Sequence, residues 1–137
     1  MIGIDLVDFL EKAEKATLNG EMHWEPAPTG ARKRLIQPEI NYERLNNIYI
    51  STNSNGKLVA VGSYDEKKYY DVDEYNFENE YFLSFTNKGY QDVLTFIRDE
   101  STDDNLSVDF QIKLGKLLRI VQIQSTNLKE NIDTWFN

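Results

Sequence analysis

Residues 47–64 have the sequence NIYISTNSNGKLVAVGSY, and this stretch decides the fold. Two runs rich in β-branched and apolar residues, 47–52 and 57–64, flank the polar segment 53–56. Asn55-Gly56 at the end of that segment is a strong hairpin signal, because glycine accepts the left-handed backbone that tight turns need. The stretch therefore predicts two antiparallel strands joined by a short turn.

Further strands are expected on both sides of this hairpin. Residues 80–86 carry apolar side chains at alternate positions, which indicates a third strand, and 90–98 favours a fourth. The segment 21–25, which is followed by Pro26, is a candidate for an additional short strand. Residues 65–79 are too polar for the centre of a sheet, and we expect an extended hairpin end or a loop there.

Helices are predicted at the two ends of the chain. Near the start, apolar residues recur at steps of three and four, with Asp5 as the expected N-cap and Asn19-Gly20 as the stop. A similar recurrence continues through the tail and predicts one long helix over about 106–135. Two helices with a break near 125–127 are the alternative.

The expected architecture is a single α+β domain over 1–137. It consists of an N-terminal helix, an antiparallel meander sheet of about four or five strands, and a long C-terminal helix or helix pair, with the helices covering one sheet face. Residues 26–43 contain all three prolines and the basic cluster at 32–34. We expect a long flexible loop there, attached to the body through Leu35 and Ile36.

The net charge of −8 is concentrated in the middle of the chain. Residues 65–104 hold twelve acidic and four basic residues, whereas the remainder holds eleven of each. Direct nucleic-acid binding is disfavoured, because it depends on a basic patch that neutralises phosphates. A basic protein partner is favoured instead, since complementary fields steer encounter.

The composition also bears on the cellular compartment. The first residues lack the basic region of a signal peptide, and no apolar run approaches the ~20 residues that a membrane helix needs. The chain contains no cysteine, which fits a reducing environment. We therefore expect a cytoplasmic location and no membrane association.

Catalytic and metal-binding patterns are weak. Without cysteine, and with His23 as the single histidine, a transition-metal site or a cysteine nucleophile is not expected. Residues 71–74 begin like a calcium loop, but Asn76 stands where that loop needs glycine. Glu66 and Lys68 match half of a metal-dependent nuclease motif that lacks its upstream carboxylate. We expect no enzyme activity, cofactor or metal, with a carboxylate-based carbohydrate-processing module as the alternative.

Residues 65–80 interleave carboxylates with aromatic rings. A surface rich in arginine and lysine would recognise this combination through ion pairs and cation–π contacts. The alternative explanation is a sheet edge that its charges protect from aggregation. The residues predicted to bind a partner are Asp65, Glu66, Tyr70, Asp71, Asp73, Glu74, Tyr75, Glu78 and Glu80.

The segment 19–24 (NGEMHW), the tyrosine-rich acidic strands and the helical tail together resemble small acidic uncharacterised proteins of phages and mobile elements of Gram-positive bacteria. This group includes anti-CRISPR and other anti-defence inhibitors. The resemblance implies a compact inhibitor in the cytoplasm of a bacterial host cell, which occupies the nucleic-acid-binding surface of a host protein and has no chemistry of its own. An immunity or antitoxin protein for a cognate toxin, and a self-associating component that dimerises through its C-terminal helix, are the alternatives.

Overall fold

The computed structural model describes residues 5–36, 44–97 and 104–136 of the chain. No helix within these ranges is long and apolar enough to cross a membrane. The elements, in chain order, are α1 (Leu6–Leu18), β1 (Glu25–Pro26), the 3-10 helix η1 (Thr29–Leu35), β2 (Leu45–Thr52), β3 (Lys57–Tyr69), β4 (Tyr75–Asn87), β5 (Leu94–Phe96), α2 (Asp104–Ser125) and α3 (Leu128–Asp133).

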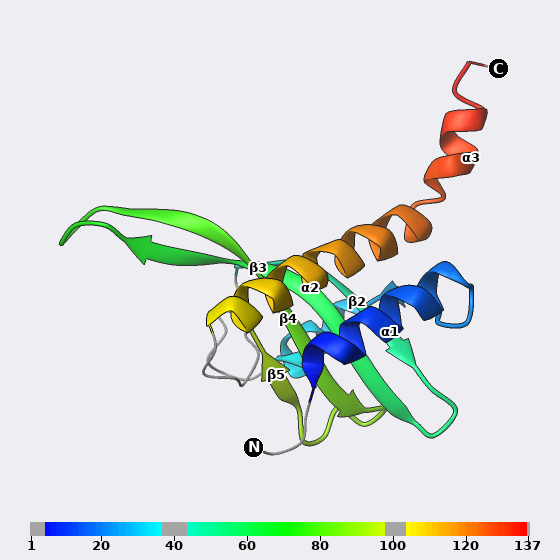
Figure 1. Ribbon diagram of the computed structural model, residues 1–137, viewed down its shortest axis with the longest axis horizontal. Coiled ribbons are helices and arrows are strands. Elements are labelled where there is room, and N and C mark those ends of the chain that lie inside the picture. Colours follow the sequence, from blue (N-terminus) through cyan, green and yellow to red (C-terminus); the bar gives the residue numbers. More distant parts are fainter. Residues whose placement is uncertain (1–4, 37–43, 98–103, 137) are drawn as a thin grey trace.

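The strands form one five-stranded antiparallel sheet in the order β1-β2-β3-β4-β5, so each strand pairs with its neighbour in sequence (Figure 1). The β2–β3 turn forms where Asn-Gly predicts it. Gly56 has a φ of +75°, and the Asn53 side-chain oxygen accepts hydrogen bonds from the backbone N–H groups of Asn55 and Lys57. The predicted α+β meander is confirmed.

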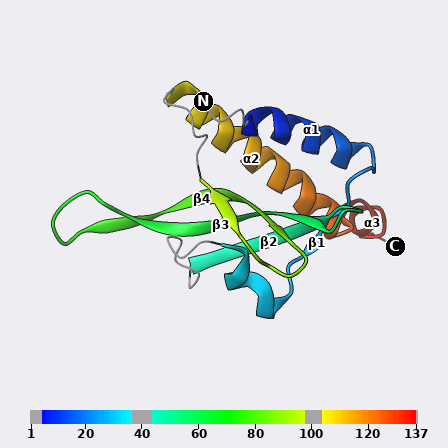
Figure 2. The ribbon, with the colours of Figure 1, turned by 90° about the horizontal axis from the view of Figure 1, so that it is seen from below.

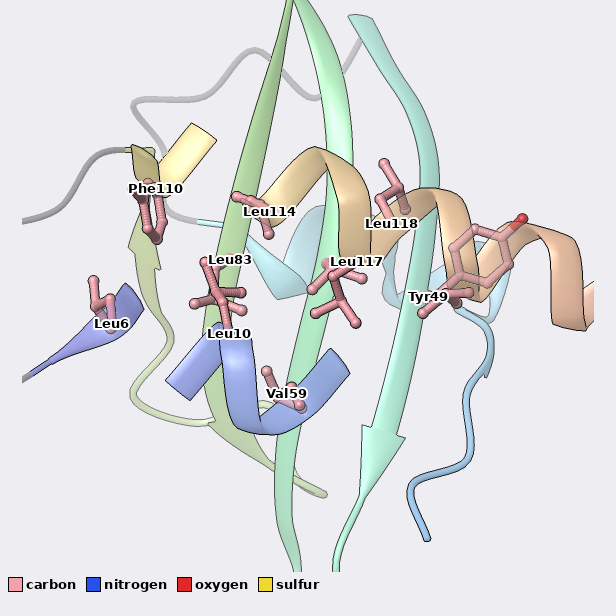
Figure 3. Packing of buried hydrophobic residues seen from close by; sticks show 12 residues of the cluster. Leu6, Leu10, Tyr49, Val59, Leu83, Phe110, Leu114, Leu117 and Leu118 are labelled. Atoms are coloured by element: carbon pink, nitrogen blue, oxygen red, sulfur yellow. The ribbon is translucent and has the colours of Figure 1, made fainter. Parts of the chain in front are cut away.

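Helices α1 and α2 lie side by side on one face of the sheet (Figure 2). Asp5 caps α1 as expected, its carboxylate accepting the backbone N–H of Asp8 at 2.9 Å. Figure 3 shows the core between the helices and the sheet, where Leu10, Leu114 and Leu117 pack against strand residues that include Leu83. Each such fully buried leucine contributes about 1.5–3 kcal/mol by leaving water.

The opposite face of the sheet is covered by η1, so residues 29–35 form a 3-10 helix and not the loop that was expected there. Ala31 and Leu35 are buried, and Leu35 packs with Ile36, Ile48 and Phe82 in a second apolar cluster. Alternating strand residues are apolar on both faces, so the sheet needs a cover on each side. Residues 37–43 of the expected loop lie outside the described residues.

Two strand predictions are wrong in their bounds. Strand β1 is Glu25–Pro26 and not 21–25, because the backbone N–H groups of Glu21 and Met22 both donate to the carbonyl of Ala16 and finish the end of α1. Strand β5 is Leu94–Phe96 and not 90–98. The φ angles of Tyr90 and Asp92 are +57° and +54°, so the chain is still turning at these residues.

The tail forms the predicted alternative of two helices. The break lies at residues 126–127, where Asn127 adopts a left-handed backbone with a φ of +51°. Helix α3 then projects away from the body (Figure 1). At the end of α2, the Gln124 side chain donates to the carbonyl of Thr17 at 3.2 Å and so joins α2 to α1.

A prediction for stability follows from Gly62 in β3, which lies opposite Phe82 in β4. A Cβ at this position would lie 2.6 Å from the Asn47 carbonyl oxygen and 2.7 Å from the Phe82 ring. Gly62→Ala should therefore lower the free energy of unfolding by roughly 1–3 kcal/mol, as overpacking does. Urea denaturation followed by circular dichroism measures the change.

Gly30→Ala is the matched control, because a Cβ there meets nothing within 4 Å. Its free energy of unfolding should stay within about 0.5 kcal/mol of the wild-type value. Equal midpoints for both variants would contradict the packing that we describe around Gly62.

Candidate functional site

The outer part of the β3–β4 hairpin, residues 65–79, projects beyond the body as a two-stranded ribbon that we call the arm (Figures 1 and 2). The ladder continues along it in one unbroken register, from Asp65 opposite Asn79 to Tyr69 opposite Tyr75. This confirms the expectation of an extended hairpin end. A rise of about 3.3 Å per residue gives the arm a reach of roughly 17 Å from Asp65 to Tyr70.

The turn at 70–74 forms the tip of the arm. The backbone N–H groups of Tyr70 and Asp71 donate to the Glu74 carbonyl at 3.2 and 3.4 Å, and the Asp71 carboxylate accepts the N–H of Val72 at 2.7 Å. The side chains of Asp71, Asp73 and Glu74 are all exposed. Three negative charges therefore stand at the most distant point of the hairpin.

Strand alternation divides the rest of the arm into two chemically different faces. Side chains two residues apart, and side chains directly opposite each other, share one face of a ribbon. The first face, called the aromatic face, carries Lys67, Tyr69, Tyr75 and Phe77, with Asp65 and Asn79 at its base. The second, called the acidic face, carries Glu66, Lys68, Asn76 and Glu78, with Glu80 at its base.

Rings and cations alternate along the aromatic face. The ring of Tyr75 lies 5.5 Å from Tyr69 and 5.4 Å from Phe77, between centroids. The Arg44 guanidinium lies over Phe77 at 4.3 Å, and the Lys67 ammonium over Tyr75 at 4.5 Å. The rings nevertheless stay 40–63% exposed. These contacts stiffen the ribbon and leave apolar surface available to another molecule.

Lys68 offsets the repulsion on the acidic face. Glu66 and Glu78 lie directly opposite, an arrangement that is unfavourable for like charges. The Lys68 ammonium lies 3.2 Å from Glu66 and 3.8 Å from Glu80. Its hydrogen bond to Glu66 raises the pKa of Lys68. On the basic side, the contribution of this Lys68 pairing is fully present at neutral pH and is lost as pH rises through that raised pKa.

The base of the arm is held to β2 by Asn46. Its side-chain amide donates to the carboxylate of Asp65 at 3.2 Å and to the side-chain oxygen of Asn79 at 3.1 Å. The Arg32 guanidinium in turn donates to the Asn46 carbonyl. Asp65 therefore takes part in attaching the arm to the body.

The nine predicted partner-binding residues lie in one element but on different surfaces. Tyr70, Asp71, Asp73 and Glu74 form the tip; Glu66, Glu78 and Glu80 belong to the acidic face; Tyr75 and Asp65 belong to the aromatic face. That prediction omits Tyr69, Phe77, Lys67 and Arg44. The period-two spacing of Lys67 with Tyr69, and of Tyr75 with Phe77, is the sequence signal that would have added the first three.

Other candidate groups lie elsewhere. Arg34 contacts the Gly89 carbonyl at 3.3 Å and lies over the Tyr90 ring, so it helps to attach η1. His23 is exposed and lies in the segment between α1 and β1, outside the arm. The described residues contain no group of three histidine or carboxylate side chains arranged to hold a metal ion.

Comparison with protein-family models, curated proteins and solved structures finds no match for this chain. The resemblance to phage and mobile-element proteins stays a prediction.

The arm should be less stable than the body, because it lies outside both apolar clusters. Phe77→Ala removes one ring contact of Tyr75 and the ring beneath Arg44. Hydrogen exchange at arm amides should accelerate roughly five- to seventyfold, since the ring pair contributes about 0.5–1.5 kcal/mol and the cation–π contact about 0.5–1 kcal/mol. The thermal midpoint of the body should not change. Hydrogen exchange with mass spectrometry measures both regions in one experiment.

Val72→Ala is the control, because this tip side chain is 86% exposed. It should leave exchange in the arm unchanged. If Phe77→Ala instead lowers the protection of 58–62 and 82–86 as much as that of the arm, the arm belongs to the same cooperative unit as the body.

Proposed function

We propose that this chain is a non-catalytic binding protein whose arm docks on a basic surface of another protein and blocks it. The observation that carries the proposal is the projection of the arm, with three exposed carboxylates at its tip and more along one face. Residues 65–80 hold seven carboxylates against two lysines. A strongly acidic segment of the chain thus projects from the body.

The shape of the arm suits a cleft. A two-stranded ribbon is narrow, and its tip can enter a groove that the wider body cannot. Clefts that hold nucleic acid are lined with lysine and arginine, which contact phosphates. Carboxylates bind the same side chains, often with two parallel hydrogen bonds to arginine. Occupation of such a cleft by the arm would exclude the nucleic acid.

The two faces of the arm would contribute differently. The tip and the acidic face supply long-range attraction, which raises the association rate and weakens as salt is added. The aromatic face supplies partly exposed rings, and tyrosine is enriched among the residues that dominate binding energy at interfaces. We assign Tyr69 and Phe77 to the contact surface together with the nine residues predicted from the sequence, which already include Tyr75.

We further propose that the partner is a nucleic-acid-handling protein of a bacterial cell, and that this chain is an anti-CRISPR or other anti-defence inhibitor of a phage or mobile element. This finer proposal rests on the acidic charge and on the resemblance described above. An immunity protein would use the same arm against a toxin. The identity of the captured partner separates the two.

Charge reversal of the tip tests the proposal. Asp71→Lys, Asp73→Lys and Glu74→Lys together change the net charge from −8 to −2. The triple variant should lose at least tenfold in partner affinity, and wild-type binding should weaken steeply with salt. The partner is first captured from bacterial lysate at low and moderate salt and identified by mass spectrometry. Affinity is then measured with the purified pair.

A variant with Glu21→Lys, Glu25→Lys and Glu130→Lys is the matched control, because these exposed carboxylates lie outside the arm and its net charge is also −2. It should bind almost as well as the wild-type chain. Equal losses in the two triple variants would show that overall charge, and not the arm, determines binding.

Self-association is a second candidate, favoured by the exposed apolar residues of the tail. Ile132, Trp135 and Phe136 are 62%, 75% and 95% exposed, and they lie in or directly after the projecting helix α3. Such a cluster of large apolar side chains often marks an interface.

Light scattering after gel filtration tests this candidate. A dimer would have twice the monomer mass of 16.0 kDa, and Ile132→Ser with Trp135→Ser should return it to the monomer. A wild-type monomer at high concentration would remove the candidate.

A further inference from the structure

A groove is lined by residues of α1, the segment 21–23 and the β2–β3 turn. The end of α1 and this turn both lie at the end of the molecule away from the arm (Figure 1). The volume of the groove is about 450 Å³, within the range of small-molecule sites. One wall comes from α1 and residues 21–23, and the other from the ends of β2, β3 and β4. No arm residue takes part.

The floor of the groove is apolar. The rings of Phe9 on α1 and Phe85 on β4 meet edge to face, with centroids 5.1 Å apart. Met22 and Val59 extend this surface, and Ala16 leaves space above it because its side chain is small. A flat ring can rest on such a floor through edge-to-face contacts.

The loop wall is held in place by hydrogen bonds. The Ala16 carbonyl accepts the N–H groups of Glu21 at 2.8 Å and Met22 at 3.1 Å. Just beyond, the indole N–H of Trp24 donates to the buried Thr17 hydroxyl at 2.9 Å. Because these bonds already order the wall, a ligand would pay little conformational entropy to bind.

The rim carries opposite charges on its two walls. Glu21 and His23 stand on the loop, and Lys57 stands at the start of β3. Within the described part of the chain, none of these three side chains has an ion-pair or hydrogen-bond partner. The Ser51 side chain also lines the groove. An apolar floor with a few polar groups around it is the usual composition of a ligand site.

We infer that this groove binds a small zwitterion with an aromatic body, the chemistry of an aromatic α-amino acid. The ring occupies the floor over Phe9 and Phe85. The ammonium group pairs with Glu21, and the carboxylate pairs with Lys57 across the mouth. This site is independent of the arm and extends beyond the protein-binding function proposed above.

Three related probes test the inference: L-phenylalanine, phenethylamine, which has only the ammonium group, and 3-phenylpropionate, which has only the carboxylate. Isothermal titration and ligand-observed NMR measure their affinities. L-Phenylalanine should bind tightest. Lys57→Gln should weaken L-phenylalanine and 3-phenylpropionate about three- to fivefold and leave phenethylamine unchanged, as expected for a partly exposed ion pair. Glu21→Gln should weaken L-phenylalanine and phenethylamine and leave 3-phenylpropionate unchanged.

Lys88→Gln and Glu25→Gln are the matched controls, because they remove the same charges from exposed positions outside the groove. They should leave all three affinities unchanged. Absence of binding by all three probes at 10 mM overturns the inference. It is also overturned if Lys57→Gln and Glu21→Gln weaken all three probes equally, whatever charge the probe carries. Neither result affects partner capture by the arm, so the two proposals fail separately.

Discussion

The hydrogen-bonded ladder between β3 and β4 is the constraint on which the rest of the molecule depends. It runs in a single register from Lys57 opposite Asn87 to Tyr69 opposite Tyr75, without a bulge. Every side chain of the two strands is therefore assigned to one of two faces along the whole length. In the body, one face packs beneath α1 and α2 and the other beneath η1. Neighbouring strands and covering helices are arranged around this one pair.

The same alternation gives the arm its chemistry. Inside the body it separates two apolar clusters, and beyond the helices it separates rings from carboxylates. Lys67 and Arg44 lie over rings, whereas Lys68 pairs with carboxylates, although Lys67 and Lys68 are adjacent in sequence. A segment that is simply acidic by composition thus becomes a ribbon with one partly apolar face and one charged face. A protein interface requires both of these: charges that attract the partner at long range and apolar surface that is buried on contact.

Much of the fold could be predicted, because its signals are local: the Asn-Gly turn, the Asp5 cap and the alternation in 80–86 act within a few residues. The failures have non-local or conformational causes. Strand β5 is short because Tyr90 and Asp92 adopt positive φ angles, and the residue type of Tyr90 does not indicate such a backbone. Helix η1 forms because the second sheet face needs a cover. The acidic residues of the arm were predicted, but their separation into faces depends on register. The groove joins α1 to distant strands, and no sequence pattern indicates it.

The unbroken pairing of the arm also limits how its length can vary. One residue inserted into or deleted from β3 between Asp65 and Tyr69 would transfer the β3 side chains beyond that point to the other face, whereas those of β4 would keep theirs, so that Tyr69 would no longer lie beside Tyr75. A change of two residues, matched in β4, would preserve both faces and alter only the reach. Variation in related chains would then be confined to paired steps in the strands or to the tip at 70–74, where no ladder fixes the count.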